Sequence, residues 1–302
     1  MCLACGEPTD KKVVRLRDGN KDSINFCKYC GLEFFNNENL NLIEDNKYEE
    51  ARLGSVGLDI PSIEEDFQNG FEQSKKYVET YIDKKWSGDI LEIGCSYGYF
   101  LKQLYDLGHN SVGVEKNPIR RKYVEKELAI KCYPDLKTIE NKKRKFDKIF
   151  MFYVIEHIDK PKEYVKRLID LLTNNGEIII ITPNLEDVLK EYWNLESHKN
   201  FFYERQSICY YTVNAAKSLL ESIQGENFSF SIDTKQGYSI FNHLSWFFTK
   251  KPSTTGIVGG DDFKITIYEN LVKGKKISNK LRNYIDEIDL NYKAIIESNN
   301  LG

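Results

Sequence analysis

Four cysteines near the start of the chain have a spacing that suits a metal ion. Cys2 and Cys5 stand in CLACG, and Cys27 and Cys30 stand in CKYCG, with a spacer of 21 residues between the two pairs. Each pair is followed by glycine, which allows a tight knuckle with two thiolates directed at one ion. Two knuckles complete the four-sulfur shell that zinc prefers, and this closed shell leaves no coordination position for a substrate. We therefore expect a structural zinc in a small ribbon over residues 1–35, with KKVVRLRD as one of its strands.

The other three cysteines, Cys95, Cys132 and Cys209, are expected to be buried thiols. The chain has seven cysteines, an odd number, and its first residues MCLACGEPTD lack the basic flank and apolar stretch of an export signal. A disulfide framework is therefore not expected, and we predict a cytoplasmic protein.

A second chemical pattern lies in ILEIGCSYGYF, residues 90–100, where an apolar run meets a glycine turn. A dinucleotide fingerprint beginning at Gly94 would need glycine at positions 96 and 99, where the chain has serine and tyrosine. The chain offers instead an acid, Glu92, followed by Gly94 and Gly98, and a second acid, Glu115, at the end of the next apolar run. A carboxylate there can accept both hydroxyls of a ribose. The pattern predicts a site for a nucleoside without a pyrophosphate.

These residues need a scaffold, and the sequence from residue 89 onward indicates one. The short apolar runs DILEI, SVGVE, DKIFMF and GEIIIIT alternate with the helical segments YFLKQLYDLG, NPIRRKYVEKEL and KPKEYVKRLIDLLTNNG. Such alternation predicts an α/β fold with a doubly wound, mostly parallel, Rossmann-like sheet. Ligands of these sheets bind at the carboxyl ends of the strands, where the strand order reverses. The glycine turn follows the first strand and so falls at the expected ligand edge.

Residues 36–86 are predicted to form a helical linker between the ribbon and the sheet. The segments ENLNLIEDNKYEEARLG and SIEEDFQNGFEQSKKYVETYIDKK carry apolar residues at roughly helical spacing. Pro61 and Ser62 suit the start of the second helix. We expect this linker to act as a lid over the ligand cleft.

Taken in order, these motifs make residues 89–235 resemble a class I S-adenosylmethionine-dependent methyltransferase. Members share an acid-x-Gly-x-Gly-x-Gly loop, an acid after the second strand and a segment close to leucine-Glu-His after the fourth, here FYVIEHIDKP. The chain departs from the loop pattern at Ser96, a change that we expect to be tolerated because serine is small. The resemblance implies an S-adenosylmethionine-binding domain over residues 87–235.

The resemblance also implies which residues hold the cofactor. The glycine turn would hold the methionine part, Glu115 the ribose, and Asp135 in YPDLK would lie near the adenine. The implied cofactor-binding set is Glu92, Gly94, Cys95, Gly98, Glu115 and Asp135.

Further motifs resemble methyltransferases of bacterial capsule, lipopolysaccharide and deoxysugar pathways. These are the four-cysteine ribbon, TPNLEDVLKEY, FFYERQSICYYT and GYSIFNHLSWFFTKKP. The resemblance implies methylation of a sugar, nucleotide-activated or glycan-linked, on a hydroxyl or on a ring carbon. It places acceptor binding and a helical extension in residues 236–302. Relatives often carry histidine just ahead of YYT, where this chain has Ser207 nearby.

Methyl transfer to a sugar hydroxyl needs an aligned acceptor, exclusion of water and a base that takes the proton. His157, after the fourth strand, and His243, among aromatic residues in FNHLSW, are equal first choices for that base. Glu156 and Tyr238 are reserves.

The remaining two histidines are not expected to take part. His109 precedes the second strand and so belongs to the opposite end of the sheet. His198, in the polar stretch ESHKN, is predicted to lie in an exposed loop.

Composition excludes several classes of partner. The formal charge of -3 gives no general attraction to nucleic acid, and residues 1–30 hold six basic and four acidic side chains, which is no electrostatic footprint for RNA. No run approaches the roughly 18 apolar residues of a membrane span. The helix-like tail over residues 274–298 suits packing or a homo-oligomer surface. Two alternatives stay open: a sugar C-methyltransferase, and a non-catalytic interaction protein with a degenerate methyltransferase domain.

Overall fold

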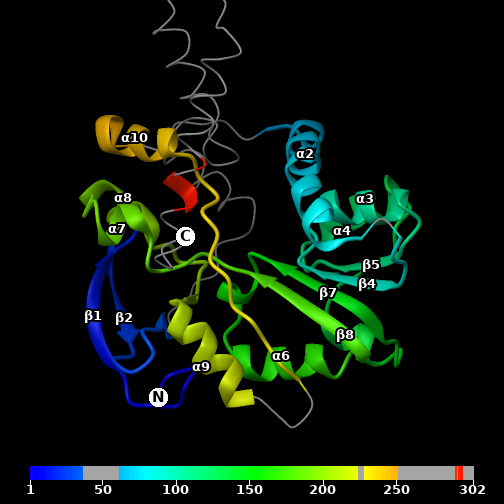
Figure 1. The fold of residues 1–302 in the computed structure, drawn as a ribbon, viewed down its shortest axis with the longest axis horizontal. Helices are drawn as coiled ribbons and strands as arrows, with labels where there is room; N and C mark the ends of the chain where they lie inside the picture. Colours follow the sequence, from blue (N-terminus) through cyan, green and yellow to red (C-terminus); the bar gives the residue numbers. More distant parts are fainter. Residues whose placement is uncertain (37–60, 84, 224–227, 251–289, 291, 295–302) are drawn as a thin grey trace, which may run out of the picture. The chain divides into compact units, whose positions relative to one another are not determined.

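The computed structural model describes residues 1–36, 61–83, 85–223, 228–250, 290 and 292–294. The chain forms two compact units. The ribbon unit comprises Met1–Ile60 and Asn184–Gly302, and the central unit comprises Pro61–Pro183. Figure 1 shows the helices and strands of both units.

The central unit is built on a parallel sheet that has five strands within the described residues, in the order β6-β5-β4-β7-β8. The chain order reverses at β4, which has β5 on one side and β7 on the other. This arrangement confirms the predicted α/β class. The strands are β4 (Asp89–Ile93), β5 (Asn110–Val114), β6 (Cys132–Tyr133), β7 (Phe146–Phe152) and β8 (Leu172–Ile181).

Local sequence signals explain where the helices of the central unit begin. The Ser62 hydroxyl accepts a hydrogen bond from Glu65 N–H, and the Glu65 carboxylate accepts one from Ser62 N–H. This capping box starts α2, as predicted. Asn117 caps α4, with Pro118 in its first turn. The helices are α2 (Ile63–Tyr81), α3 (Tyr99–Asp106), α4 (Pro118–Lys126), α5 (Leu136–Glu140), the 3-10 turn η2 (Ile155–His157) and α6 (Pro161–Ile169).

Helices cover both faces of this sheet, with α2 and α3 on one side and α6 on the other (Figure 1). On the α2 side, Phe100 and Leu104 of α3 pack with Ile90 and Phe150 of the sheet, and Tyr77 and Tyr81 of α2 close the cluster. The apolar residues of α2 recur at helical spacing, so they share one face of the helix. This face packs on the side of the sheet that α3 also covers.

The predicted helix over residues 160–176 is wrong in its last turns. α6 ends at Ile169 and β8 begins at Leu172, because the backbone from Leu172 pairs with β7. Phe146 pairs with Leu172 but Lys148 pairs with Glu177, so the intervening residues bulge from the ladder. A Cβ on Gly176 would lie 2.9 Å from the Phe146 carbonyl oxygen, so the close approach at this bulge requires glycine.

The ribbon unit contains, in its described part, an antiparallel sheet with the order β1-β2-β3-β9. The predicted strand KKVVRLRD is confirmed as β1. The strands are β1 (Asp10–Arg15), β2 (Lys21–Phe26), β3 (Glu33–Phe34) and β9 (Cys209–Tyr210). The helices are α7 (Val188–Glu191), α8 (Glu196–Phe202), α9 (Val213–Ile223) and α10 (Ile240–Thr249).

The ribbon shares its core with residues far along the chain. Leu16 and Ile24 of the ribbon pack with Leu185, Tyr203 and Tyr210 in one buried cluster. β9 also pairs with the edge strand β3. Residues 184–223 therefore belong with the ribbon, whereas the sequence pattern predicts them as part of the cofactor-binding segment 87–235. A short sheet with one apolar face must cover that face, and these residues supply the cover.

Two predicted helical segments, residues 38–54 and most of 274–298, lie outside the described residues. Among the helices that are described, none combines the length and the apolar character needed to span a bilayer.

Candidate functional site

The glycine turn and both acids lie at the carboxyl ends of β4 and β5, where the strand order reverses. Glu92 and Ile93 end β4, Gly94 opens the turn, and Glu115 directly follows β5. β4 and β5 are parallel neighbours, so their carboxyl ends meet at one edge of the sheet. This edge is where sheets of this class bind ligands.

Both glycines of the turn have left-handed backbone. Gly94 has a φ of 72°, and a Cβ there would lie 2.4 Å from Cγ2 of Val154. Gly98 has a φ of 83° at the N-cap of α3, and a Cβ there would lie 2.8 Å from Cδ1 of Leu128. Only glycine combines this conformation with these close approaches.

Ser96 also has left-handed backbone, with a φ of 50°. Glycine adopts this φ more readily than serine does, so side-chain size alone is an incomplete explanation of the departure at this position. The Ser96 N–H donates to Oε2 of Glu115 at 2.9 Å, and this bond ties the turn to the next strand. The turn thereby holds a conformation that disfavours non-glycine residues.

Glu115 is fixed by two backbone hydrogen bonds. Its Oε2 accepts from Ser96 N–H, and its Oε1 accepts from Asn117 N–H at 2.8 Å. The side chain is 6% exposed. A carboxylate has about four lone-pair positions, so each oxygen keeps capacity for another donor such as a ribose hydroxyl.

Glu92 is, like Glu115, a buried acid at this edge of the sheet, but one of its carboxylate oxygens has no hydrogen-bond partner among the described residues. The Leu101 N–H in the first turn of α3 donates to the carboxylate, but Oε2 has no hydrogen-bond partner among the described residues. Burial, and next the negative charge of Glu115, raise the pKa of Glu92 to about 8. An orphaned acid beside the turn fits a ligand that carries cationic groups, as S-adenosylmethionine does.

The backbone N–H groups of the turn are already used inside the protein. Gly94 N–H and Cys95 N–H both donate to the Val114 carbonyl, and Gly98 N–H donates to the Cys95 carbonyl. These three N–H groups therefore shape the turn. The role of these residues toward the methionine part stays a prediction.

The three cysteines outside the ribbon pairs are buried free thiols, as predicted. The Sγ of Cys95 lies 3.6 Å from the Sγ of Cys132. A Cβ on Gly113 would lie 2.5 Å from the Cys95 Sγ, so glycine in β5 makes room for this thiol. The contact with the Cys132 thiol, and next burial, raise the pKa of Cys95, which makes it an unreactive thiol.

Asp135 lies just beyond β6 as the N-cap of α5. Its Oδ1 accepts from both the N–H and the hydroxyl of Thr138, each at 2.8 Å. These bonds hold the pKa of Asp135 below its usual value. This position follows the edge strand β6, and the adenine role of Asp135 stays a prediction.

A hydrogen-bond chain from α2 to the turn is a feature that sequence reasoning missed. Tyr99 OH donates to Oδ2 of Asp66 at 2.6 Å and lies 3.3 Å from the Ser96 hydroxyl. A Cβ on Gly70 would lie 2.6 Å from the Tyr99 ring, so α2 packs directly on α3. Asp66 and Tyr99 are 33 residues apart, and no short-range motif links them.

Two of the four predicted catalytic residues follow β7 in the central unit. Glu156 is buried and accepts a hydrogen bond from the Thr182 hydroxyl at 3.0 Å, while His157 is partly exposed. Tyr153, two positions ahead of the 3-10 turn, has a φ of 56°, and non-glycine residues with such strain cluster at functional sites. Sequence reasoning missed Tyr153.

The other two predicted catalytic residues lie in the ribbon unit. The Tyr238 side chain is 44% exposed. His243 is 0% exposed, its Nδ1 lies 2.5 Å from the Tyr292 hydroxyl, and its Nε2 has no partner among the described residues. Burial lowers the pKa of His243 to about 3. General bases work best when their pKa lies near the operating pH, so this environment disfavours His243 as the base.

Of the remaining histidines, one prediction is confirmed and one is wrong. His109 stands just before β5 at the amino end of the sheet, as expected. His198 lies in α8 and is 9% exposed, against the prediction of an exposed loop. Its ring packs edge-on against Trp246 with centroids 5.1 Å apart, so aromatic packing buries it.

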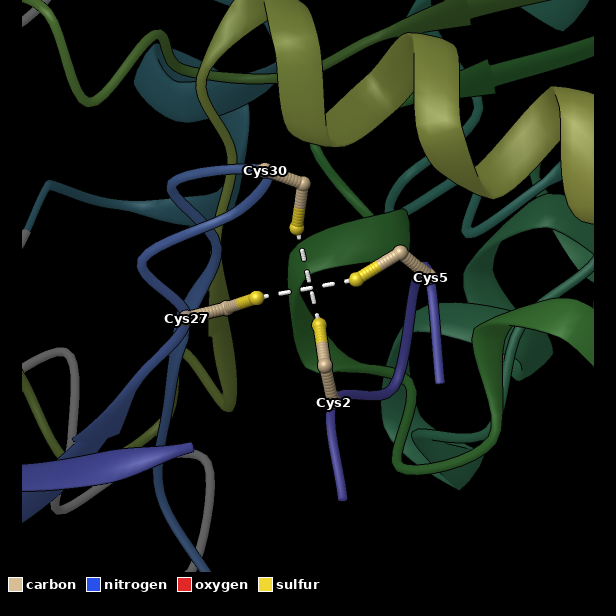
Figure 2. A group of neighbouring side chains, drawn as sticks. All are labelled: Cys2, Cys5, Cys27 and Cys30. Carbon is tan, nitrogen blue, oxygen red and sulfur yellow. Dashed lines mark hydrogen bonds between the residues drawn. The ribbon is translucent and has the colours of Figure 1, made fainter. Parts of the chain in front are cut away.

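The four ribbon cysteines converge on one point (Figure 2). The Sγ atoms of Cys2 and Cys30 are 3.5 Å apart, as are those of Cys5 and Cys27, and all four sulfurs lie within 4.8 Å of one another. Tetrahedral zinc with Zn–S bonds of about 2.3 Å places its sulfurs about 3.8 Å apart. The four residues therefore fit a zinc ion.

The second knuckle is held by the start of α9. The Thr212 hydroxyl donates to the Cys30 carbonyl at 2.8 Å and accepts from Ala215 N–H at 3.0 Å. Asn214 donates to the Tyr29 carbonyl at 3.1 Å. The cysteine site and α9 are thus joined by hydrogen bonds that no sequence motif indicates.

A known protein family matches the middle of the chain. Residues 68–227, more than half of the chain, match the family described as a methyltransferase domain. No curated protein matches the chain significantly.

Several solved structures resemble this one at low identity. A SAM-dependent methyltransferase from Archaeoglobus fulgidus is 22% identical, with 57% of this chain and 76% of that chain covered and a TM-score of 0.43. The plantazolicin methyltransferase BpumL in complex with SAH is 19% identical, with 74% and 83% covered and a TM-score of 0.43. The sugar N-methyltransferase KedS8 from Streptoalloteichus is 19% identical, with 42% and 56% covered and a TM-score of 0.35.

Proposed function

The chain belongs to the methyltransferase-domain family and is an S-adenosylmethionine-dependent methyltransferase, and from this premise we propose that it O-methylates a sugar in bacterial surface polysaccharide synthesis. The main observation in support of a methyltransferase is the arrangement at the sheet edge. Beside the glycine turn lie Glu92, which is buried with an Oε2 unpaired among the described residues, and Glu115, whose carboxylate is held in place by two backbone N–H groups. Both glycines of the turn and the second acid are present, which disfavours a degenerate, non-catalytic domain.

The sugar acceptor is supported by the resemblance of the ribbon and the later motifs to polysaccharide-pathway methyltransferases. The structure joins the ribbon with two of these motifs, since FFYERQSICYYT supplies β9 and the segment TPNLEDVLKEY contributes Leu185 to the shared core. The residues proposed for the cofactor all lie in the central unit. The ribbon unit is accordingly our proposed acceptor-binding part.

When bound, S-adenosylmethionine supplies a methyl group that its sulfonium already activates. The protein then has to hold the nucleoside, orient the acceptor and remove one proton. Glu115 would hold the ribose, and the hydrogen-bonded turn would set the position of the methionine part. The chain from Asp66 through Tyr99 to Ser96 would keep α2 over the turn and limit access of water.

His157 is our first choice for the base, ahead of His243. His157 is partly exposed and lies in the same unit as the cofactor residues, whereas His243 is fully buried with a pKa of about 3. We expect His157→Gln to reduce turnover by about 100-fold to 10,000-fold while affinity for S-adenosylhomocysteine stays nearly unchanged. If the His157→Gln variant keeps a tenth or more of wild-type turnover, His157 is not the base, and Glu156, Tyr238 or His243 becomes the candidate for that role.

We also propose that Cys2, Cys5, Cys27 and Cys30 bind one structural zinc, on the basis of their converging sulfurs. The ion would fix the two knuckles and take no part in methyl transfer, because four sulfurs close its coordination shell. Elemental analysis should give one zinc per chain, and Cys27→Ser should lower that value.

The proposed activity is tested by incubating the protein with isotopically labelled S-adenosylmethionine and a panel of nucleotide sugars, followed by mass spectrometry. A labelled methyl ether on one sugar supports O-methylation, whereas label on a ring carbon supports the C-methyltransferase alternative. Transfer to RNA but to no sugar would overturn the proposal. We propose that the reaction takes place in the cytoplasm, where nucleotide sugars are made. We also propose that the protein can form a homo-oligomer.

A further inference from the structure

Tyr153 and Tyr77 place two phenol hydroxyls side by side in the central unit. Tyr153 directly follows β7, and Tyr77 belongs to α2, 76 residues earlier in the chain. Their hydroxyl oxygens are 3.5 Å apart. A good O–H···O hydrogen bond spans roughly 2.5 to 3.0 Å, so the contact is long. A ligand oxygen placed between the two hydroxyls would lie within bonding distance of both.

The protein holds both tyrosines in place. The Tyr77 ring stacks on Phe152, with centroids 4.5 Å and ring planes 25° apart. Tyr153 has a φ of 56°, and its N–H donates to the Ile181 carbonyl at 2.8 Å, so the pairing of β7 with β8 fixes this strained backbone. Asparagine and glycine adopt such a φ at a lower cost than tyrosine. The presence of tyrosine despite that cost points to a use for its side chain.

The tyrosine pair stands next to the glycine turn. Val154, the residue after Tyr153, approaches Gly94 so closely that a Cβ on this glycine would lie 2.4 Å from the Val154 Cγ2. Glu156 and His157, two candidates for the base, follow in the 3-10 turn η2. Tyr153 is nevertheless 49% exposed, so a ligand can reach it from solvent. The pair therefore occupies a place where an acceptor would meet the cofactor residues.

We propose that the hydroxyls of Tyr153 and Tyr77 bind one ring hydroxyl of the sugar acceptor and so determine which other oxygen of the ring receives the methyl group. A sugar hydroxyl donates and accepts hydrogen bonds, as a phenol does, so it can accept from one tyrosine and donate to the other. The pair orients the acceptor, and the proton released on methyl transfer goes to the separate base. The central unit thereby adds a contact to the acceptor-binding part that we propose for the ribbon unit. This inference rests on the proposed function, because it takes the acceptor to be a sugar.

Steady-state kinetics on Tyr153→Phe and Tyr77→Phe test this role, with the nucleotide sugar that wild type methylates fastest in the labelled panel as the substrate. Each variant keeps its ring and loses one hydroxyl. We expect kcat/KM for the sugar to fall about 2-fold to 12-fold in each, as the loss of one neutral hydrogen bond predicts, while the Kd for S-adenosylhomocysteine stays within about twofold of wild type. Tyr105→Phe is the matched control, because Tyr105 on α3 is 50% exposed and lies outside the proposed site. This control should behave as wild type.

Monodeoxy analogues of the same sugar identify the contact. Each analogue keeps the methylated hydroxyl and lacks one other ring hydroxyl. With the analogue that lacks the bound hydroxyl, wild type should lose activity and Tyr153→Phe should lose nothing further, because the interaction is already gone. With the other analogues, Tyr153→Phe should show its full loss.

Tyr153→Asn separates acceptor binding from a structural role. Asparagine tolerates left-handed backbone, so this variant should unfold at a temperature no lower than wild type, while its kcat/KM falls at least as far as that of Tyr153→Phe. A midpoint lowered by more than about 5 °C with unchanged kcat/KM would make Tyr153 a structural residue.

The outcomes separate this inference from the proposed function. Wild-type kcat/KM in both phenylalanine variants, or an equal loss in Tyr153→Phe with every analogue, overturns the role of the tyrosine pair and leaves the methyltransferase assignment intact. A folded wild-type protein that binds S-adenosylhomocysteine but methylates no sugar of the panel overturns the proposed acceptor class and this inference together.

Discussion

Glu115 combines a structural and a ligand-binding role in one buried side chain. Its two oxygens hold the Ser96 and Asn117 N–H groups, so the same carboxylate that would receive the ribose also anchors the turn. A hydrogen bond to a charged acceptor is worth about 1.5 to 3 kcal/mol. We predict that Glu115→Ala weakens S-adenosylhomocysteine binding at least about tenfold by calorimetry, because ribose contacts and turn geometry are lost together.

Glu115→Gln provides the control for this prediction. The glutamine keeps one acceptor oxygen of similar shape, so its loss of affinity should be smaller than that of the alanine variant. Wild-type affinity in Glu115→Ala would contradict the ribose assignment.

His243 illustrates a different residue-level effect, the dependence of stability on pH. The folded protein keeps this histidine neutral down to pH 3 or so, while the unfolded chain protonates it near pH 6.5. The unfolded state therefore binds more protons between these values, and stability falls as the pH drops through them. From pH 7 to pH 5 the loss due to His243 should be about 2 kcal/mol.

We predict that His243→Phe removes this part of the acid sensitivity. The free energy of unfolding, measured by urea denaturation at pH 7 and pH 5, should change by about 2 kcal/mol less in the variant than in wild type. His157→Gln, at a partly exposed position, serves as the comparison. An unchanged difference in His243→Phe would mean that the folded protein protonates His243 as readily as the unfolded chain does.

At the scale of elements, the ribbon and α9 support each other through Thr212. Its hydroxyl caps the first turn of the helix and holds the Cys30 carbonyl, so one side chain serves two elements. Groups that orient metal ligands from outside the coordination shell typically contribute 10-fold to 100-fold in metal affinity. We predict that Thr212→Val weakens zinc binding about tenfold and lowers stability by about 1 kcal/mol through the lost cap.

Competition with a chromogenic chelator measures that zinc affinity, and thermal unfolding measures the stability. Thr212→Ser keeps the hydroxyl and should stay close to wild type in both. Equal zinc affinity in the valine and serine variants would show that the Thr212 hydroxyl does not support the metal site.

At the scale of the whole molecule, the two units divide the proposed tasks. The cofactor residues lie in the central unit, whose sheet, α2 and α3 share a core of their own, and the cysteine site lies in the ribbon unit. We predict that Cys27→Ser, with its zinc lost, still binds S-adenosylhomocysteine within about threefold of wild type while it loses methyl transfer. Calorimetry on the full chain below its unfolding temperature tests this.

A metal-depleted wild-type sample provides the second arm of the same measurement. If removal of zinc abolishes cofactor binding in a chain that circular dichroism shows to be folded, the cofactor site depends on the ribbon, and the proposed division is wrong.

The sequence by itself determined the features whose partners lie close along the chain or repeat at a fixed period. The C-x-x-C knuckles, the Ser62 cap, the glycine turn and the alternation of strands and helices are of this kind, because knuckle spacing, capping and backbone conformation depend on neighbouring residues. These signals alone predict the α/β class and the cofactor and metal candidates. The helix predicted through residue 176 shows the limit, since pairing with β7 outweighed helical periodicity there.

Only the tertiary structure decided how distant segments meet. The pairing of β3 with β9, the bond from Thr212 to Cys30 and the chain from Asp66 to the turn join residues between about 30 and 180 positions apart. The orphaned oxygen of Glu92 and the buried ring of His243 are likewise properties of surroundings assembled from several elements. Burial, pKa and hydrogen-bond partners follow from three-dimensional packing, and no local spacing of residue types specifies which segments pack together.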